Sequence, residues 1–194
     1  MNIINDIFNK ISLFDLIMGL LISLSVLAVF VAIFIDFMKF GNRKSKNSKH
    51  SFVATGTMFI FFFLYYIVIV SKLFAIPTNW WVKIIGTIMI ITGAIINILG
   101  RRYLGQNWAN HIKIYDNHTL ITTGVYKICR HPLYSSIMLM LFGGSVVFGN
   151  WLTAILTAGV FIPMMNYRAK QEEQMLIQKF LEYKEYMKKT RRFI

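Results

Sequence analysis

The stretch FVATGTMFIFFFLYYIVIV, residues 52–70, contains no charged side chain. A helix of about 20 residues crosses the roughly 30 Å hydrocarbon core of a bilayer, so this stretch predicts a transmembrane helix. Apolar runs of similar length flank it on both sides, from Leu16 to Phe37 and from Trp81 to Leu99. The 194-residue chain is 56% hydrophobic, which is well above the usual fraction for a soluble domain. The sequence therefore predicts an integral membrane protein.

A fourth apolar region, residues 133–161, is too long for a single crossing. Gly143, Gly144, Gly149 and Asn150 interrupt it, and Gly149–Asn150 has the composition of a tight turn. We therefore predict two short helices in this region, and an all-α fold with five transmembrane helices. The alternative is one long buried helix across the whole region.

The formal charge of +13 is distributed asymmetrically along the chain. With five crossings, residues 39–50, 101–132 and 168–194 lie on the same side, and they hold all but three of the 21 Lys and Arg residues. This asymmetry predicts an external amino terminus and a cytoplasmic carboxyl terminus. It also explains the basic composition without a nucleic acid, because anionic membrane lipids attract basic segments.

We divide the chain into two halves. Residues 1–100 hold three transmembrane helices and the basic loop 39–50, and residues 101–194 hold the polar segments in which chemistry is expected. The second half consists of a cap, a helical hairpin and an amphipathic tail, at residues 101–132, 133–166 and 167–194.

Local patterns predict the form of the cap and of the tail. Alternating apolar residues around a polar Asp-Asn-His turn, within residues 112–125, predict a small hairpin. Leu176, Phe180 and Tyr183 recur at helical spacing among Lys and Glu, which predicts an amphipathic helix lying on the membrane face. Residues 41–51 are interpreted as a short polar linker without chemistry.

Two groups of ionisable residues stand at the edges of apolar segments. Arg130 and His131 directly precede Pro132, a residue that favours the start of a helix. Arg168 and Glu172 are spaced i, i+4 on one helical face. Ionisable residues at a membrane edge indicate function. The plain alternatives are an exposed helical ion pair for the second group, and membrane phosphates as the partner of Arg130. The four histidines lack the paired spacing of metal ligands, so no metal site is predicted.

Two segments carry a recognisable set of motifs: HTLITTGVYKICRHPLY at residues 118–134, and RAKQEEQMLIQKFLEYKEYMKKTRRFI at residues 168–194. They resemble the isoprenylcysteine carboxyl methyltransferases and, more broadly, the membrane phospholipid methyltransferases. The shared pattern is HxL, GxY, RHPxY and RxxxEE, and LGQNW at residues 104–108 is similar to the family's LGxxW. The resemblance extends from Arg101 to the end of the sequence.

The resemblance implies an enzyme that binds S-adenosylmethionine in a cytoplasmic pocket capped by the RHPxY segment. It implies that Glu172 binds the methionyl amino group, and that Arg168 is the catalytic residue and contacts the substrate. His111 corresponds to a polar position that contacts the cofactor in relatives, and is a further candidate. The remaining cofactor contacts that the resemblance implies are His118, Thr119, Leu120, Ile121, Tyr126, His131, Pro132, Leu133 and Tyr134.

The type of acceptor follows from proton chemistry. A carboxylate is already ionised at pH 7 and needs no general base, whereas an amine must first lose a proton. Glu173, His131 and Tyr134 are the candidates for accepting that proton. We therefore expect a lipophilic small-molecule or prenylated substrate that enters from the bilayer and offers a carboxylate or thiol-like acceptor, in the first place the carboxylate of an isoprenylcysteine. The alternatives are N-methylation of phosphatidylethanolamine, a non-catalytic lipid-binding membrane protein, and a nicotinamide-dependent reductase.

Overall fold

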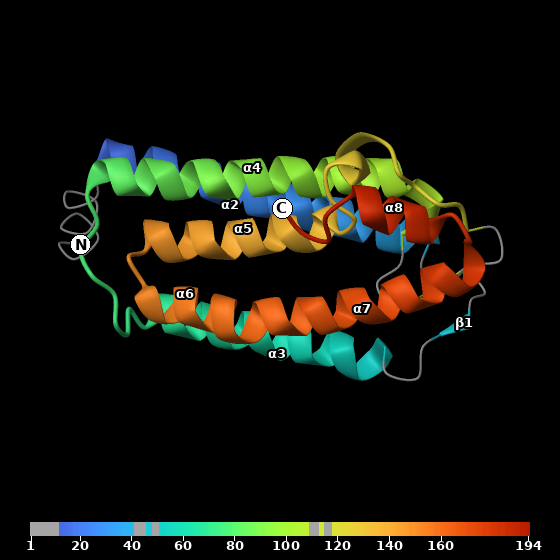
Figure 1. The fold of residues 1–194 in the computed structure, drawn as a ribbon. Coiled ribbons are helices and arrows are strands. Elements are labelled where there is room, and N and C mark those ends of the chain that lie inside the picture. The colour runs from blue at the N-terminus through green and yellow to red at the C-terminus, as the bar shows by residue number, and fades with distance from the viewer. Residues whose placement is uncertain (1–11, 41–45, 48–50, 109–112, 115–117) are drawn as a thin grey trace.

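A computed structural model describes residues 12–40, 46–47, 51–108, 113–114 and 118–194. This part of the chain is helical apart from one pair of two-residue strands, and its long helices run along the same axis (Figure 1). In chain order the elements are α2 (Leu13–Phe40), β1 (Lys46–Asn47), α3 (Ser51–Val70), α4 (Trp80–Leu104), the 3₁₀ turn η1 (Gly105–Asn107), β2 (Lys113–Ile114), the 3₁₀ turn η2 (Gly124–Lys127), α5 (Pro132–Val147), α6 (Trp151–Leu156), the π turn η3 (Thr157–Phe161), α7 (Ile162–Lys179) and α8 (Tyr183–Lys189).

Two helices of the described residues are long and apolar enough to span a membrane, at Leu13–Lys39 and Trp80–Asn107. Two shorter apolar helices, Gly56–Val70 and Pro132–Val147, accompany them. Large apolar side chains also cover the outside of the bundle, and Phe59, for example, is 72% exposed. Apolar surface of this kind indicates contact with lipid. The fold is therefore that of an all-α protein suited to a membrane.

The turn expected at Gly149–Asn150 is confirmed. α5 ends at Val147, and Gly149 has a φ of 59°, a left-handed conformation that favours glycine. The Asn150 side chain accepts a hydrogen bond from the Thr153 amide at 3.1 Å and caps α6. Two helices therefore occupy the fourth apolar region, and the alternative of one long helix is wrong.

Gly143 and Gly144 do not interrupt this region, contrary to expectation, because both lie inside α5. A Cβ atom on Gly143 would lie 2.7 Å from the Gly86 carbonyl oxygen of α4, and a Cβ atom on Gly86 would lie 2.7 Å from the Gly143 carbonyl oxygen. The two glycines thus allow the backbones of α4 and α5 to approach closely, as small residues do between membrane helices.

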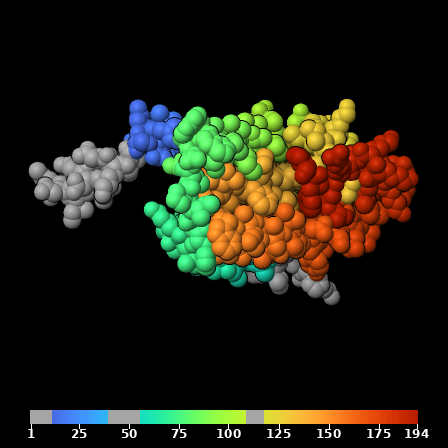
Figure 2. All heavy atoms as spheres, turned by 60° about the vertical axis from the view of Figure 1, so that its left-hand side comes forward, coloured from blue at the N-terminus to red at the C-terminus, as the bar shows by residue number. Residues whose placement is uncertain are grey.

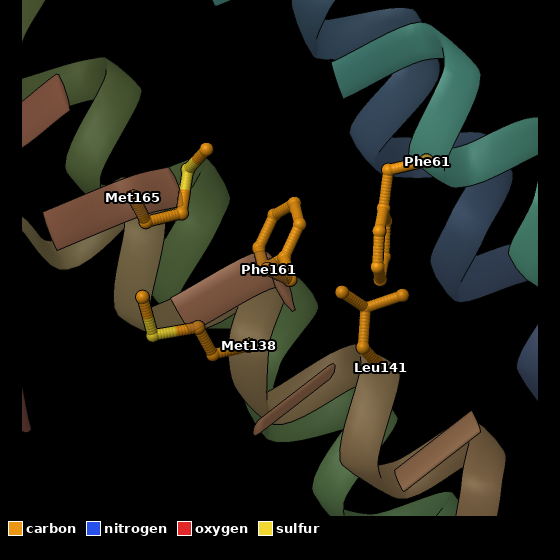
Figure 3. Close-up of a cluster of buried hydrophobic side chains, with 5 residues drawn as sticks. All are labelled: Phe61, Met138, Leu141, Phe161 and Met165. Carbon is orange, nitrogen blue, oxygen red and sulfur yellow. The ribbon is translucent and has the colours of Figure 1, made fainter. Parts of the chain in front are cut away.

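The core that positions α7 lies between α3, α5 and the continuous α6–η3–α7 helix. Phe61, Met138, Leu141, Phe161 and Met165 pack together there (Figure 3). The ring centroids of Phe61 and Phe161 are 4.9 Å apart. Because this cluster joins α5 to α7, it fixes the relative position of the polar residues at the same end of both helices.

The expected hairpin within the cap is not found in the described residues. β2 pairs antiparallel with β1, so that Lys46 lies opposite Ile114 and Asn47 opposite Lys113. Residues 118–123 have no regular secondary structure before η2 begins. Two residues of the expected linker, Lys46 and Asn47, therefore pair with the cap, whereas the hairpin was expected to form within the cap alone.

The tail is not a single amphipathic helix on the membrane face. α7 ends at Lys179, Phe180 is extended with φ −123° and ψ 111°, and α8 begins at Tyr183. The last residues then return to the backbone of residues 129–131, and the tail covers one end of the molecule beside the 118–130 segment (Figure 2). The reason is that the partners of the tail lie at the start of α5, which a straight helix would not reach.

Candidate active site

Pro132 begins α5, as predicted, and fixes two ring side chains beside it. Proline is favoured at the first helical position because its missing N–H would have no helical partner there. His131 directly precedes the helix and Tyr134 lies in its first turn. The two rings stack with centroids 5.4 Å apart and an interplanar angle of 5°. Both polar groups therefore face the same neighbour, which is α7.

α7 presents Arg168 and Glu172 to Tyr134. Arg168 Nε donates a hydrogen bond to the Tyr134 hydroxyl oxygen at 2.8 Å, and the hydroxyl donates to Glu172 Oε1. The direct separation of Arg168 Nε from Glu172 Oε1 is 3.6 Å. Because Arg168 is only 5% exposed and is tied to a second helix, the alternative of an exposed helical ion pair is wrong.

The adjacent glutamates of α7 have different environments. The Glu173 side chain is 3% exposed, whereas that of Glu172 is 26% exposed. Three donors reach the Glu173 carboxylate: Arg130 Nε at 3.0 Å, His131 Nε2 at 3.2 Å and Arg192 Nη2 at 2.6 Å. Glu173 is therefore committed to interior partners, and Glu172 is the carboxylate that a ligand can reach.

Hydrogen bonds determine the ionisation of this cluster. Burial alone would raise the pKa of Glu173, but hydrogen bonds from its three donors lower that pKa to about 2. Burial also acts against the charge of Glu172, but a hydrogen bond from His131 and the charge of Arg168 lower its pKa. Both carboxylates are therefore ionised at neutral pH.

His131 lies between the two glutamates. Its Nδ1 is 3.5 Å from Glu172 Oε2 and its Nε2 is 3.2 Å from Glu173 Oε1. Burial would lower the pKa of His131, but hydrogen bonds to Glu172 and Glu173 raise it. An imidazolium, which carries a proton on both nitrogens, fits this position.

Asn107 anchors the 118–121 segment to the end of α4. Its Nδ2 donates to the carbonyl and hydroxyl oxygens of Thr119 at 3.1 and 2.9 Å, and its Oδ1 accepts from the Thr119 amide at 3.1 Å.

Burial, followed by the charge of Lys179, lowers the pKa of His118 to about 4. The His118 imidazole is therefore neutral at pH 7, and suited to contact with an uncharged ring.

The other expected cofactor contacts surround the same end of the bundle. Tyr126 is buried in η2, where its carbonyl oxygen accepts a hydrogen bond from the Tyr186 hydroxyl. Burial, followed by the charge of Glu172, raises the pKa of Tyr126, and the charge of Glu172 also acts on His118. Pro132 is buried, and three apolar residues are half-buried: Leu120, Ile121 and Leu133.

Sequence reasoning missed three contributors to the site. Asn107 lies within the LGQNW motif, and Arg192 lies within the basic end of the tail. Both segments were singled out in the sequence, but neither residue was assigned a role. Met58 lies in the charge-free stretch that indicated only a membrane helix, yet its sulfur accepts a hydrogen bond from Arg168 Nη1 at 3.4 Å. The first two form hydrogen bonds that depend on the folded path of the chain, which motif spacing does not encode.

Two further residues singled out in the sequence have different outcomes. The Arg130 side chain is 8% exposed and pairs with Glu173, so membrane phosphates are wrong as its partner. His111 lies outside the described residues and stays a prediction.

The arrangement offers complementary groups to a ligand with separate charges and an apolar part. Glu172 can hold a cationic group and Arg168 can hold an anionic one. The half-buried apolar residues of the 118–121 segment can contact an uncharged ring. Such a set is suited to hold charged reactants in place, and it can do so without a group that takes up a proton.

Comparison with known proteins agrees with the motifs. The isoprenylcysteine carboxyl methyltransferase (ICMT) family matches residues 84–178. The chain is 35% identical over 114 residues to the probable protein-S-isoprenylcysteine O-methyltransferase of Oryza sativa subsp. indica, covering 57% of this chain and 60% of that protein. It is 36% identical over 111 residues to protein-S-isoprenylcysteine O-methyltransferase A of Arabidopsis thaliana, covering 56% of each.

A relative with a different name shares the same level of identity. The cobalt-zinc-cadmium resistance protein CzcN of Cupriavidus metallidurans is 36% identical over 92 residues, which are 46% of this chain and 42% of that protein. The chain thus spans less than two thirds of the length of these curated relatives.

Proposed function

We propose, from the match of residues 84–178 to the isoprenylcysteine carboxyl methyltransferase family, that this chain is a membrane methyltransferase. Its methyl donor is S-adenosylmethionine. Its acceptor is the carboxylate of an isoprenylcysteine-like molecule, either a lipophilic small molecule or a prenylated protein, which enters from the bilayer.

The observation that carries this proposal is the position of the Tyr134 hydroxyl between Arg168 and Glu172. It accepts from Arg168 Nε at 2.8 Å and donates to the Glu172 carboxylate. The Arg168 guanidinium and the Glu172 carboxylate thus lie side by side, with Arg168 Nε 3.6 Å from Glu172 Oε1. Reactants of opposite charge can therefore be held next to each other, which is the alignment that an in-line transfer requires.

The residues present fit the proposed methyl donor. The ionised, 26% exposed Glu172 suits a cationic amino group. The neutral His118 and the half-buried Leu120 suit an uncharged aromatic base. When bound, the donor supplies an electrophilic methyl group on a sulfonium. The role of the chain is to orient the reactants and to exclude water.

Arg168 is proposed to hold the acceptor carboxylate. A carboxylate with an ordinary pKa of about 4 is ionised at neutral pH, so the chain need not remove a proton from it. A guanidinium can bind it through two parallel hydrogen bonds. Arg168 also contacts Met58 of α3, a helix with an exposed apolar face, and this contact supports the arrival of a lipophilic acceptor from the bilayer.

We propose five membrane crossings, with the site and the carboxyl terminus in the cytoplasm. The pairing of β1 with β2 and the return of the tail to residues 129–131 support this, because they gather the three basic segments at one end. A reporter fused after Ile194 should be cytoplasmic, and one inserted within residues 73–80 should be external. Reversal of either location would exclude the proposed orientation.

Donor binding tests the proposed function. Purified protein in detergent should bind S-adenosylmethionine in isothermal titration, and ligand at about 100 times the dissociation constant should stabilise the fold by roughly 2.7 kcal/mol. NADPH is the matched control ligand, because the reductase alternative requires it. Binding of NADPH without binding of S-adenosylmethionine would exclude the methyltransferase.

A further inference from the structure

The backbone of the tail is paired with the residues that begin α5. The Arg130 amide donates to the Arg191 carbonyl oxygen at 2.8 Å, and the His131 amide donates to the Arg192 carbonyl oxygen at 3.1 Å. Amides that precede a helix have no partner within it, so the tail satisfies groups that would otherwise need water. Residues 190–194 are thereby held in a fixed register against the site.

Arg192 donates two hydrogen bonds to the Glu173 carboxylate. Its Nε lies 3.1 Å from Glu173 Oε1 and its Nη2 lies 2.6 Å from Glu173 Oε2. Its remaining nitrogen, Nη1, donates to Asn166 Oδ1 at 2.7 Å. A planar fork fixes the plane of a carboxylate, which a single ammonium group does not do.

The same carboxylate contacts His131. Glu173 Oε1 lies 3.2 Å from His131 Nε2, while the other ring nitrogen faces Glu172. The His131 ring in turn stacks on Tyr134 at 5.4 Å. Arg192 is therefore linked through one residue to the ring that lies between both glutamates.

We propose that Arg192 is a positioning residue for the cofactor site, and that it acts through Glu173 on the orientation and charge of His131. This inference rests on the proposed function and assigns a role to a residue beyond the matched residues 84–178. Arg130 does not duplicate this role, because both of its contacts with Glu173 are to Oε1, whereas Arg192 also binds Oε2.

The charges around His131 give the proposal a specific signature. Among the described residues, the titratable and charged groups in contact with His131 or its carboxylate partners are Glu172, Glu173, Arg130, Tyr134, Arg168 and Arg192. The charge of Glu172 also acts on His118 and Tyr126, and the charges of both glutamates act on Tyr183. Removal of Arg192 takes one cation away from Glu173, so that this carboxylate acts more strongly on His131. The pKa of His131 should then rise. A side chain that only supports the fold would not move it.

The test compares Arg192→Ala and Arg192→Lys with Arg191→Ala in the full-length protein in detergent. Arg191 is an exposed neighbour of the same residue type, and its backbone contact with Arg130 survives the substitution. Isothermal titration measures the affinity for S-adenosylmethionine. Side-chain ¹⁵N spectra of the histidines, assigned with His131→Gln, measure the titration of His131 without any ligand.

We expect Arg192→Ala to weaken binding of S-adenosylmethionine about tenfold or more, the scale of one charge-assisted hydrogen bond, and to raise the pKa of His131. Arg192→Lys should leave the pKa of His131 close to that of the wild type, because the positive charge is kept. It should still weaken binding of S-adenosylmethionine, because an ammonium group lacks the planar fork of a guanidinium. Arg191→Ala should match the wild type in both measurements.

The outcomes separate this inference from the proposed function. If the wild type binds no S-adenosylmethionine, the proposed function falls, while the His131 titration still tests the link to Arg192. Equal affinities and equal titrations in Arg192→Ala and Arg191→Ala would overturn the positioning role. If Arg192→Ala does not fold, Arg192→Lys decides: an affinity equal to that of the wild type would overturn the role.

Discussion

Arg168 donates to the hydroxyl of Tyr134 across 2.8 Å, although 34 positions separate them in the sequence. This contact joins the RHPxY motif at the start of α5 to the RxxxEE motif of α7. The site therefore depends on the packing of two helices against each other, which the core cluster between them maintains.

Tyr134→Phe should destabilise the fold and impair turnover together. The substitution leaves the buried Arg168 without the hydroxyl that accepts its Nε–H, a loss on the order of 1–3 kcal/mol for a buried group. Tyr167→Phe is the matched control, because Tyr167 neighbours Arg168 but is 57% exposed. Thermal unfolding in detergent measures the difference. Equal melting temperatures for the two variants would show that the Tyr134 hydroxyl contributes nothing.

Arg168 and Glu172 should fail in different ways if their proposed roles are right. Glu172→Ala removes the partner of a cationic group and should weaken binding of S-adenosylmethionine by roughly 1.5–3 kcal/mol. Arg168→Ala should keep most of that affinity but lower the rate of methyl transfer. Arg168→Lys should restore little of the methyl transfer.

Donor titration and turnover on a prenylcysteine analogue measure both effects. Glu185→Ala is the control, since Glu185 forms a surface pair with Lys188 and its side chain is 62% exposed. Small and equal effects of the Arg168 and Glu172 substitutions on both readouts would refute the separate roles.

Acid stability should report on Glu173. Its pKa in the folded protein is about 2, below the ordinary value of 4.5. A lowered pKa stabilises the fold above the ordinary value, and this contribution is lost as the pH falls toward the folded value. The free energy of unfolding should therefore fall as the pH is lowered through that window.

Glu173→Gln is the comparison for this effect, because it removes the titrating group. Melting temperatures recorded from pH 5 down to pH 2.5 should decline more steeply for the wild type than for Glu173→Gln. Parallel declines would mean that other carboxylates cause the acid sensitivity.

Much of the fold was predictable because apolar length and turn chemistry are local. The charge-free stretch at residues 52–70 and the Gly149–Asn150 turn needed no tertiary information. Gly143 was misread because a glycine that allows close helix packing looks the same in sequence as one that breaks a helix. The bend at Phe180 was missed because helical spacing continues across it, while the partners of the tail are distant in sequence.

For the site, too, local motifs were predictable from the sequence and long-range contacts were not. The motifs identified His131, Tyr134 and Glu172, which the structure brings together. They assigned Glu172 the cofactor contact but did not predict that Glu173 is buried, because its partners Arg130, His131 and Arg192 are distant from it in the sequence. Arg192 reaches Glu173 only through the folded path of the tail.

Gly143→Ala should separate α4 from α5. Its Cβ would meet the Gly86 carbonyl oxygen at 2.7 Å and Ile90 Cγ1 at 2.8 Å, so overpacking should cost about 1–3 kcal/mol. Gly56→Ala is the control, because a Cβ at Gly56 of α3 meets nothing within 4 Å. Thermal unfolding of both variants should show a loss only for Gly143→Ala. An unchanged melting temperature there would mean that the helices do not pack closely at these glycines.

Transfer of a labelled methyl group from S-adenosylmethionine to an S-prenylcysteine analogue tests the central claim most directly. We predict that the wild-type protein forms a methyl ester, that mild alkali releases the label as methanol, and that Arg168→Ala forms much less of this product. A wild-type protein that binds S-adenosylmethionine but transfers no label would contradict the claim. So would a labelled product that resists alkali, because it would carry the methyl group on nitrogen or sulfur instead of a carboxylate.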